Sequence, residues 1–239
     1  MFVHLRLHTE FSVVDGTCRL DDVLKAAQAD GQPALAITDL NNLFGGLKFY
    51  KSARSKGVKP VLGAELVMLP QGDEGESRLL VLVQNHQGYL NLSEILARAW
   101  TQPLGKTQTQ AQVAWAWLQE LHAGLIVLSG AHTGLVGQAL LRGDAATASR
   151  HALALAEMFP HRFYLELQRA GRAEDEALVA QTVELAARLQ LPVVATQPIQ
   201  FLRPDDFQAH EARVCIAGGE ILANPRRVRR FTREQYFKS

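Results

Sequence analysis

The stretch LIVLSG at residues 125–130 decides the fold class, because it opens with four apolar residues in a row. A second run, PVVATQ at residues 192–197, has the same character. A strand that is apolar on both faces is typical of a parallel sheet covered by helices on each side. The two runs therefore predict an α/β protein.

Working outward from these runs, apolar strand-like segments alternate with segments of helical periodicity, which favours parallel α/β architecture. The predicted strands are residues 2–9, 34–39, 59–69, 79–85, 125–130, 162–168 and 192–197. The predicted helices are residues 20–31, 45–57, 88–100, 113–122, 134–144, 146–159, 174–190 and 205–219. Neither a G-x-G-x-x-G motif after the first strand nor a G-x-x-x-x-G-K-[ST] motif occurs, which disfavours a dinucleotide fold or a P-loop nucleotidase. A closed or nearly closed barrel fits better.

The composition is that of an ordinary globular protein with a sizeable core. The chain has 239 residues, of which 47% are hydrophobic and 21% charged, and its formal net charge is +1. That charge gives no overall attraction to nucleic acid or membranes. Cys18 and Cys215 are expected to be buried and reduced. No apolar run is long enough for a membrane span and no secretory signal opens the chain, so we expect a cytoplasmic protein.

The ends of the predicted strands carry the candidate site, because parallel barrels place their chemistry at the C-terminal ends of the strands. The first half of the ring offers His8, Asp15, Asp39 and Glu65, whereas the second half offers amides, alanines and a proline. A hydrolytic cluster of two or three metals needs more ligands than these four. Arg6 would repel a cation, and we expect it to pair with Asp39 or Glu65.

Each of these residues also has a structural interpretation. His8 is more readily a hydrogen-bonded core histidine than a ligand once its neighbours are not ligands. Asp39 could equally cap a segment starting at Asn41 and Asn42 as pair with an arginine. Glu65 is the hardest to explain structurally, since a buried carboxylate needs a partner.

One basic cluster lies near the end of the chain. It could be a solvated or interdomain segment, which we favour, or it could contact phosphates with salt-dependent affinity. The candidate contact residues are Arg226, Arg227, Arg229 and Arg230, followed by Arg233.

Seven motifs in one order resemble a known family. They are HLRLHTEFSVVDG, ALAITDLNNLFG, GVKPVLGAEL, LIVLSG, FYLELQRAGR, PVVATQ and AHEARVCI. Together they resemble the polymerase-and-histidinol-phosphatase (PHP) domain, in the version that opens the bacterial replicative DNA polymerase III alpha subunit. The resemblance runs from residue 2 to the TREQYFKS end. It implies a distorted seven-stranded (β/α) barrel, TIM-like and of PHP type, over residues 1–223. A basic segment, 224–239, would then lead towards the polymerase core.

Metal-binding members of that family carry nine ligands, and most of the matching positions here hold residues that cannot ligate a metal. The His-x-His motif is Arg6-Leu7-His8, the Asp-His motif is Asp39-Leu40, and the final Asp-x-His motif is Pro198-Ile199-Gln200. The substituted positions are Arg6, Leu40, Ala131, Ala170, Pro198 and Gln200. The remnants are His8, Asp39 and Glu65, with Asp15 as a fourth.

The resemblance therefore implies a domain of a DNA-directed DNA polymerase that binds no metal cluster and has no catalytic residues of its own. Its implied partners are the polymerase core of the same chain, the proofreading exonuclease subunit, which would dock on it, and DNA through the full-length protein. The alternative is a residual phosphoesterase or pyrophosphatase that holds Mg²⁺, Mn²⁺ or Zn²⁺ on His8, Asp39 and Glu65. A free-standing histidinol-phosphatase-like enzyme is disfavoured, because it needs the missing ligands.

Overall fold

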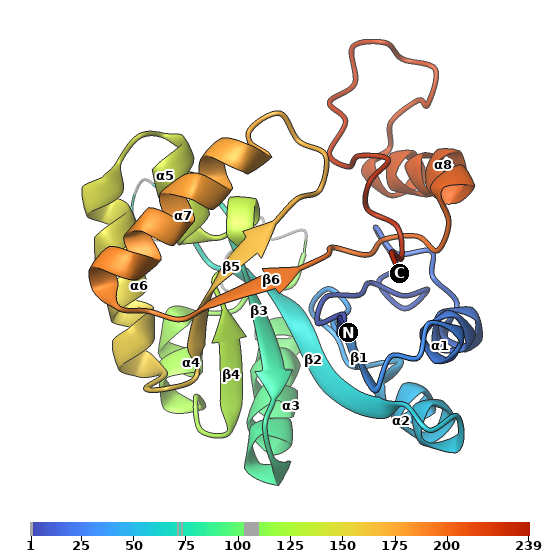
Figure 1. Ribbon diagram of the computed structural model, residues 1–239, viewed down its shortest axis with the longest axis horizontal. Coiled ribbons are helices and arrows are strands. Elements are labelled where there is room, and N and C mark those ends of the chain that lie inside the picture. The colour runs from blue at the N-terminus through green and yellow to red at the C-terminus, as the bar shows by residue number, and fades with distance from the viewer. Residues whose placement is uncertain (1, 71, 73, 103–109) are drawn as a thin grey trace. The chain divides into compact units, whose positions relative to one another are not determined.

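Helices and strands alternate along most of the computed structural model, which describes residues 2–70, 72, 74–102 and 110–239 (Figure 1). The strands are β1 (Ala34–Ile37), β2 (Lys59–Met68), β3 (Ser77–Val83), β4 (Leu125–Leu128), β5 (Phe163–Gln168) and β6 (Val193–Thr196). The α-helices are α1 (Leu20–Ala29), α2 (Gly46–Ser55), α3 (His86–Thr101), α4 (Trp115–Glu120), α5 (Leu135–Leu141), α6 (Ala145–Met158), α7 (Asp175–Leu189) and α8 (Phe207–Gly218). Two short 3₁₀ helices, η1 (Ala131–Thr133) and η2 (Pro204–Asp206), precede α5 and α8. All eight predicted helices are present, so the α/β class is confirmed.

The chain divides into two compact units. Unit 1 contains Met1–Leu62, Arg169–Ala173 and Thr196–Ser239, and unit 2 contains Gly63–Gln168 and Glu174–Ala195. Unit 1 includes the basic segment, which the Phe201–Tyr236 bridge ties to the residues after β6. The domain boundary expected at residue 223 stays a prediction.

The strands follow one another in chain order, from β1 to β6, in a sheet of mixed direction. In unit 1, β1 runs parallel to the first part of β2, with Ala34 opposite Lys59 and Ile37 opposite Leu62. In unit 2, β3 runs antiparallel to β2 and to β4, and β4 runs parallel to β5. The prediction of a parallel sheet was therefore wrong for β3. A short connection between Met68 and Ser77 cannot make the crossover that a parallel pair requires.

The described residues contain six strands, so the expected seven-stranded closed barrel is not confirmed. The segment predicted as the first strand makes only isolated bridges, from Leu7 to Ile199 and from Thr9 to Cys18. The Leu7 amide donates to the Thr38 hydroxyl at 2.9 Å, in place of a main-chain carbonyl. A side chain thus takes a position that a continuous ladder would need, and the segment stays irregular.

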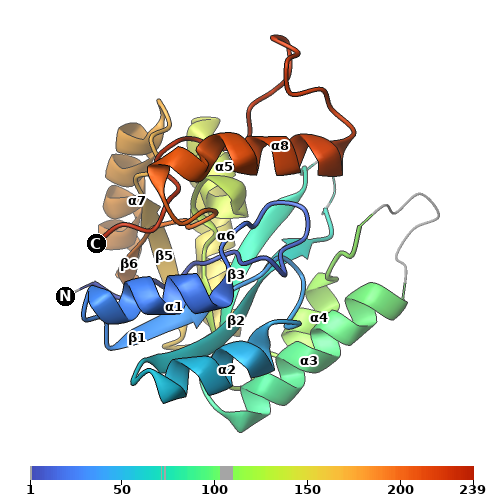
Figure 2. The ribbon, with the colours of Figure 1, turned by 90° about the vertical axis from the view of Figure 1, so that its right-hand side faces the viewer.

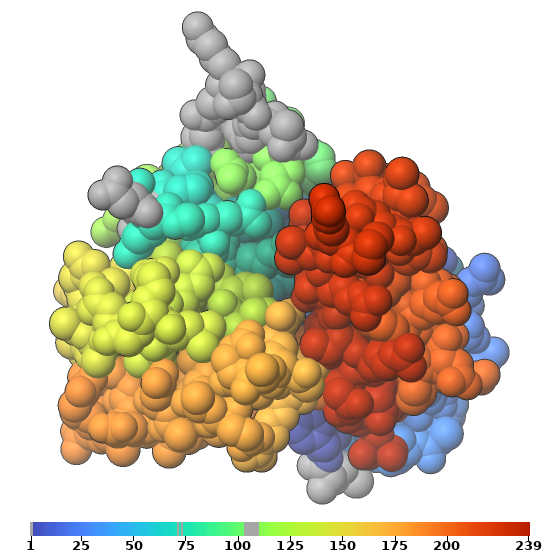
Figure 3. Space-filling model, turned by 90° about the horizontal axis from the view of Figure 1, so that it is seen from above, coloured from blue at the N-terminus to red at the C-terminus, as the bar shows by residue number. Residues whose placement is uncertain are grey.

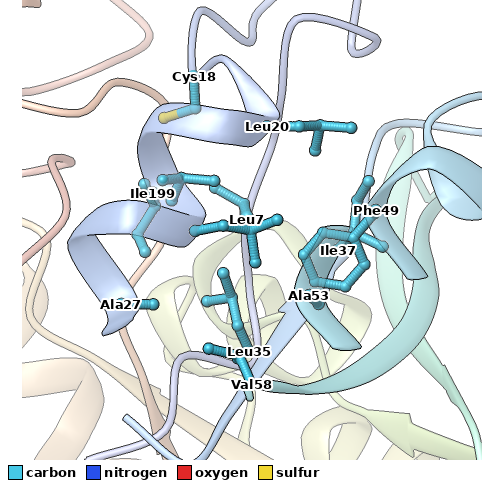
Figure 4. Close-up of a cluster of buried hydrophobic side chains, with 12 residues drawn as sticks. Leu7, Cys18, Leu20, Ala27, Leu35, Ile37, Phe49, Ala53, Val58 and Ile199 are labelled. Carbon is cyan, nitrogen blue, oxygen red and sulfur yellow. The ribbon is translucent and has the colours of Figure 1, made fainter. Parts of the chain in front are cut away.

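The core of unit 1 surrounds Leu7 (Figure 4). Helix α1 buries Leu20, Val23, Leu24 and Ala27, whose spacing places them on one helix face. Helix α2 adds Phe49 and Ala53, and it ends before Gly57, whose φ of +74° suits a residue without a side chain. Cys18 and Cys215 are buried and unbridged, as predicted, and burial raises the pKa of the Cys18 thiol.

In unit 2, the described parts of α3 and α4 lie side by side (Figure 2), and Arg98 Nη1 contacts Glu120 Oε2 at 2.6 Å. Strand β3 buries Leu79, Leu80 and Val81. Across the part of the chain that the structure describes, no helix has the length and apolarity needed to cross a membrane.

Candidate functional site

His8 and Asp15 form the centre of the candidate site, which lies in unit 1. His8 is fully buried, and its Nδ1 lies 2.8 Å from Asp15 Oδ1. The Ser12 hydroxyl donates to the same carboxylate oxygen at 2.7 Å, and it accepts from the Leu40 amide at 3.1 Å. The turn Ser12–Gly16, closed by amides that donate to Ser12 O, brings Asp15 back against His8. Asp15 and Gly16 therefore lie in a turn.

Asp39 follows β1 and is held by one residue. Its Oδ1 accepts from the Thr9 amide at 2.6 Å, and its Oδ2 accepts from the Thr9 hydroxyl at 2.8 Å. Burial raises the pKa of Asp39 to about 6, against the opposing effects of the Thr9 hydrogen bonds and of His8. Among the described residues Asp39 neither caps the segment at Asn41 nor pairs with Arg6, so both predicted roles were wrong. Thr9 thus supplies both a main-chain and a side-chain hydrogen-bond donor to Asp39.

His210 closes the other side of Asp15. This fully buried residue of α8 donates from Nε2 to the carbonyl oxygen of Asp15 at 2.7 Å. Its ring packs against Phe201 and Phe231, with ring centroids 5.2 and 4.8 Å away. Burial lowers the pKa of His210, which favours the neutral imidazole. His210 therefore has a hydrogen-bonding role inside the protein.

Several substituted ligand positions also lie in unit 1. The main chain of Ile199 makes two hydrogen bonds to the segment of residues 2–9. Its oxygen accepts from His8 N, and its amide donates to Arg6 O. Its neighbours Pro198 and Gln200 are buried beside that segment. Ala170 is fully buried, and its carbonyl accepts from the Thr232 hydroxyl. These positions are filled by groups that pack or hydrogen-bond within the protein.

Two further predicted positions lie in unit 2. Glu65 is 2% exposed, and its Oε2 accepts from Arg78 Nη1 at 3.3 Å. Arg78 is thus the cationic partner that the buried carboxylate of Glu65 needs. Ala131 begins η1 with a φ of +46°, and a methyl group is all that it offers.

The donor set does not fit the family's metal cluster. A carboxylate on Nδ1 is a common way to orient a ligating histidine, so His8 by itself could serve. His8 would need further ligands beside it. Arg6 is a buried cation, and the Asp39 oxygens already accept two hydrogen bonds from Thr9. Within the described ranges, no group of three His, Cys, Asp or Glu side chains could hold a metal ion.

The basic cluster divides into two sets. Arg227 pairs with the buried Glu211 of α8, and Arg229 lines a cavity beside that helix. Arg226 and Arg230 are exposed, as Arg229 is, but neither of them lines that cavity.

Sequence reasoning missed three residues that shape these sites: Thr9, Ser12 and Glu211 as an ion-pair partner. Ser12 could have been found, because a serine three residues before an aspartate can close a turn with it. Thr9 and Glu211 gave no such signal, since their partners are 30 and 16 residues away in the chain.

Comparison with known proteins gives a matching family and full-length alignments to longer relatives. The family model described as the PHP domain matches residues 4–170. DNA polymerase III subunit alpha of Neisseria meningitidis is 48% identical over 241 residues, and that of Escherichia coli K12 is 42% identical over 240. These alignments cover 99% and 100% of this chain. The chain spans about a fifth of those relatives' length, 21% and 20%.

Solved structures with low sequence identity share the fold. An amidohydrolase from Chromobacterium violaceum has a TM-score of 0.57 at 14% identity, over 88% of this chain and 96% of its own. A candidate metal-dependent phosphoesterase from Bifidobacterium adolescentis has a TM-score of 0.50 at 13% identity, over 82% and 86%. At such identities the likeness concerns the fold alone.

Proposed function

Because the chain belongs to the PHP domain family, we propose that it is a metal-free, non-catalytic PHP domain of a replicative DNA polymerase alpha subunit. The observation that carries this proposal is that the remaining ligand-type side chains make hydrogen bonds within the protein. His8 Nδ1 meets Asp15, and Asp39 accepts from Thr9. In this proposal these residues bind and orient one another and do not activate water.

The parent protein would be a cytoplasmic DNA-directed DNA polymerase whose nucleotidyl-transfer residues lie outside this sequence. Support comes from the 42–48% identity to alpha subunits along nearly the whole chain. The domain supports the polymerase core, and it is brought to DNA through the full-length protein. The basic segment 224–239 is the part of the chain that leads towards that core.

An activity assay tests the non-catalytic role. The chain is incubated with Mg²⁺, Mn²⁺ or Zn²⁺ and either an activated phosphodiester or pyrophosphate. We expect hydrolysis no faster than with the His8→Ala variant at equal concentration. Metal-dependent turnover that disappears in His8→Ala would establish the residual hydrolase instead.

The domain would also dock the proofreading exonuclease subunit. Where a separate subunit supplies the nuclease activity, a metal site in this domain is not needed and its ligands can be lost. Unit 1 has large apolar side chains at its surface that a partner could cover, with Val13, Phe44 and Leu47 each about two-thirds exposed. A pull-down of the exonuclease subunit with the full alpha subunit should succeed. The Val13→Asp and Phe44→Asp variants should weaken it more than the surface variant Tyr89→Asp. If all three variants retained the exonuclease subunit equally, the surface around Val13 and Phe44 would not be the docking surface.

A further inference from the structure

A cavity of about 450 Å³ opens in unit 1 between α8 and the segment that follows it. This volume is within the range of small-molecule sites. In Figure 3 the orange-red and red atoms of this part of the chain reach the surface. The lining residues are Pro204, Asp205, Phe207, Gln208, Glu211, Leu222, Arg227, Arg229 and Arg233.

Three arginines of the segment after α8 line the cavity: Arg227, Arg229 and Arg233. Residues 228–232 of this segment have no helix or turn. Arg227 pairs with Glu211 on α8, and Phe231 packs on the α8 residue His210 with ring centroids 4.8 Å apart. Arg229 lies between these two contacts in the chain and lines the cavity. Val228 is 76% exposed, and neither Arg226 nor Arg230 is among the residues that line the cavity.

Some of the charged side chains that line the cavity are paired with an opposite charge, and others are not. Glu211 is 2% exposed and is neutralised by Arg227, whose own side chain is largely buried. Arg233 lies over the Phe207 ring at 5.5 Å, which fixes its guanidinium without neutralising it. Within the described part of the chain, Arg229 and Arg233 have no hydrogen-bonded or ionic partner on their side chains. Asp205 is the remaining acid, so the lining has a net positive charge.

From this geometry we propose that the cavity binds a phosphate group, held by Arg229 and Arg233, with Arg227 as a positioning residue anchored by Glu211. Guanidinium groups match phosphate oxygens in pairs, so two unneutralised arginines on one cavity suit this ligand. The phosphate belongs either to a single-stranded nucleic-acid backbone or to a free phosphoanion, because both present the same oxygens. The proposal does not depend on the metal-free state of the site around His8.

Calorimetric titration of the chain tests the site with two probes, pyrophosphate and a short unphosphorylated oligothymidylate. The test variant is Arg229→Gln with Arg233→Gln. The matched control is Arg226→Gln with Arg230→Gln, which removes the same charge from the same segment but outside the cavity. We expect the test variant to weaken binding at least about tenfold, and the control less than about twofold.

The two probes identify the source of the phosphate. Binding of pyrophosphate alone assigns a free phosphoanion, and binding of the oligonucleotide, displaced by pyrophosphate, assigns a nucleic-acid backbone. Asp205→Asn should tighten whichever probe binds, because it removes a repelling charge. Failure of both probes to bind the unmodified chain would overturn the proposal. So would equal losses in the two arginine pairs, which would indicate diffuse surface charge.

Discussion

Asp39 illustrates how hydrogen bonds from a single neighbour, Thr9, can hold a buried carboxylate in place. Its oxygens accept from both the amide and the hydroxyl of Thr9, which satisfies part of its hydrogen-bonding capacity. Burial nevertheless dominates, and the pKa rises from 3.8 to about 6. The charged form is therefore disfavoured in the folded protein.

The Asp39→Asn variant should remove one pH dependence of stability. Between about pH 4 and pH 6 the unfolded chain releases the Asp39 proton and the folded chain retains it, so folding becomes less favourable as pH rises. The loss is on the order of 3 kcal/mol for a shift of this size. Urea unfolding at pH 4, 5, 6 and 7 should show the wild-type stability falling relative to Asp39→Asn. A constant difference across this range would contradict the assignment.

His210 should matter for stability more than any exposed histidine. His210→Ala removes the hydrogen bond to the Asp15 carbonyl and the packing against Phe201 and Phe231. We expect a loss of about 2–4 kcal/mol in the free energy of unfolding. The matched control is His86→Ala, at the exposed start of α3, which should stay within about 0.5 kcal/mol. Equal effects in chemical denaturation would refute the buried role of His210.

Sequence reasoning identified His8, Asp15, Asp39 and Glu65, because ligand-type residues at strand ends stand out from apolar runs. It gave the wrong partners for Asp39, since an arginine was expected and Thr9 holds it. Partner choice among buried groups depends on ångström-scale approach of distant segments, and residue type alone does not encode that distance. The pairing of Arg6 with Glu65 stays a prediction.

At the scale of elements, the start of α3 depends on a close approach of two glycines. A Cβ on Gly88 would lie 1.9 Å from the Gly124 carbonyl oxygen, and the Gly88 amide donates to Asn85, the N-cap of the helix. Helix α3 therefore begins against the turn that precedes β4.

Gly88→Ala should destabilise the protein by about 2–4 kcal/mol, although alanine is the better helix former. The backbone must shift to admit the methyl group, and the Asn85 cap would shift with it. Gly75→Ala is the matched control, because no atom lies within 4 Å of its added Cβ. Thermal unfolding of both variants measures the difference, and a Gly88→Ala protein as stable as the control would exclude the clash.

Helices were predictable because their apolar spacing is local: α1 and α6 end within two residues of the expected bounds. Strand direction was less predictable. The short polar connection between β2 and β3 is typical of a hairpin, yet the apolar run of β3 suggested another parallel strand. The segment of residues 2–9 alternates like a strand, and only the Thr38 hydroxyl, distant in sequence, shows why its ladder is interrupted.

At the scale of the whole molecule, positions that the resemblance matches to metal ligands also contribute to the fold. Pro198 and Gln200 are buried, and the main chain of Gln200 bonds to Thr17 and Gln235. Such positions contribute to packing whether or not they ligate a metal. Other residues at such positions are therefore compatible with an intact fold, as the proposed scaffold role requires.

Metal content measures the scaffold role most directly. The chain and its His8→Ala variant are stripped with chelator, dialysed against Mn²⁺ or Zn²⁺, and then analysed by inductively coupled plasma mass spectrometry. Both proteins should retain equal metal, far below one ion per chain. One or more ions per chain in the wild type, lost in His8→Ala, would contradict the metal-free assignment.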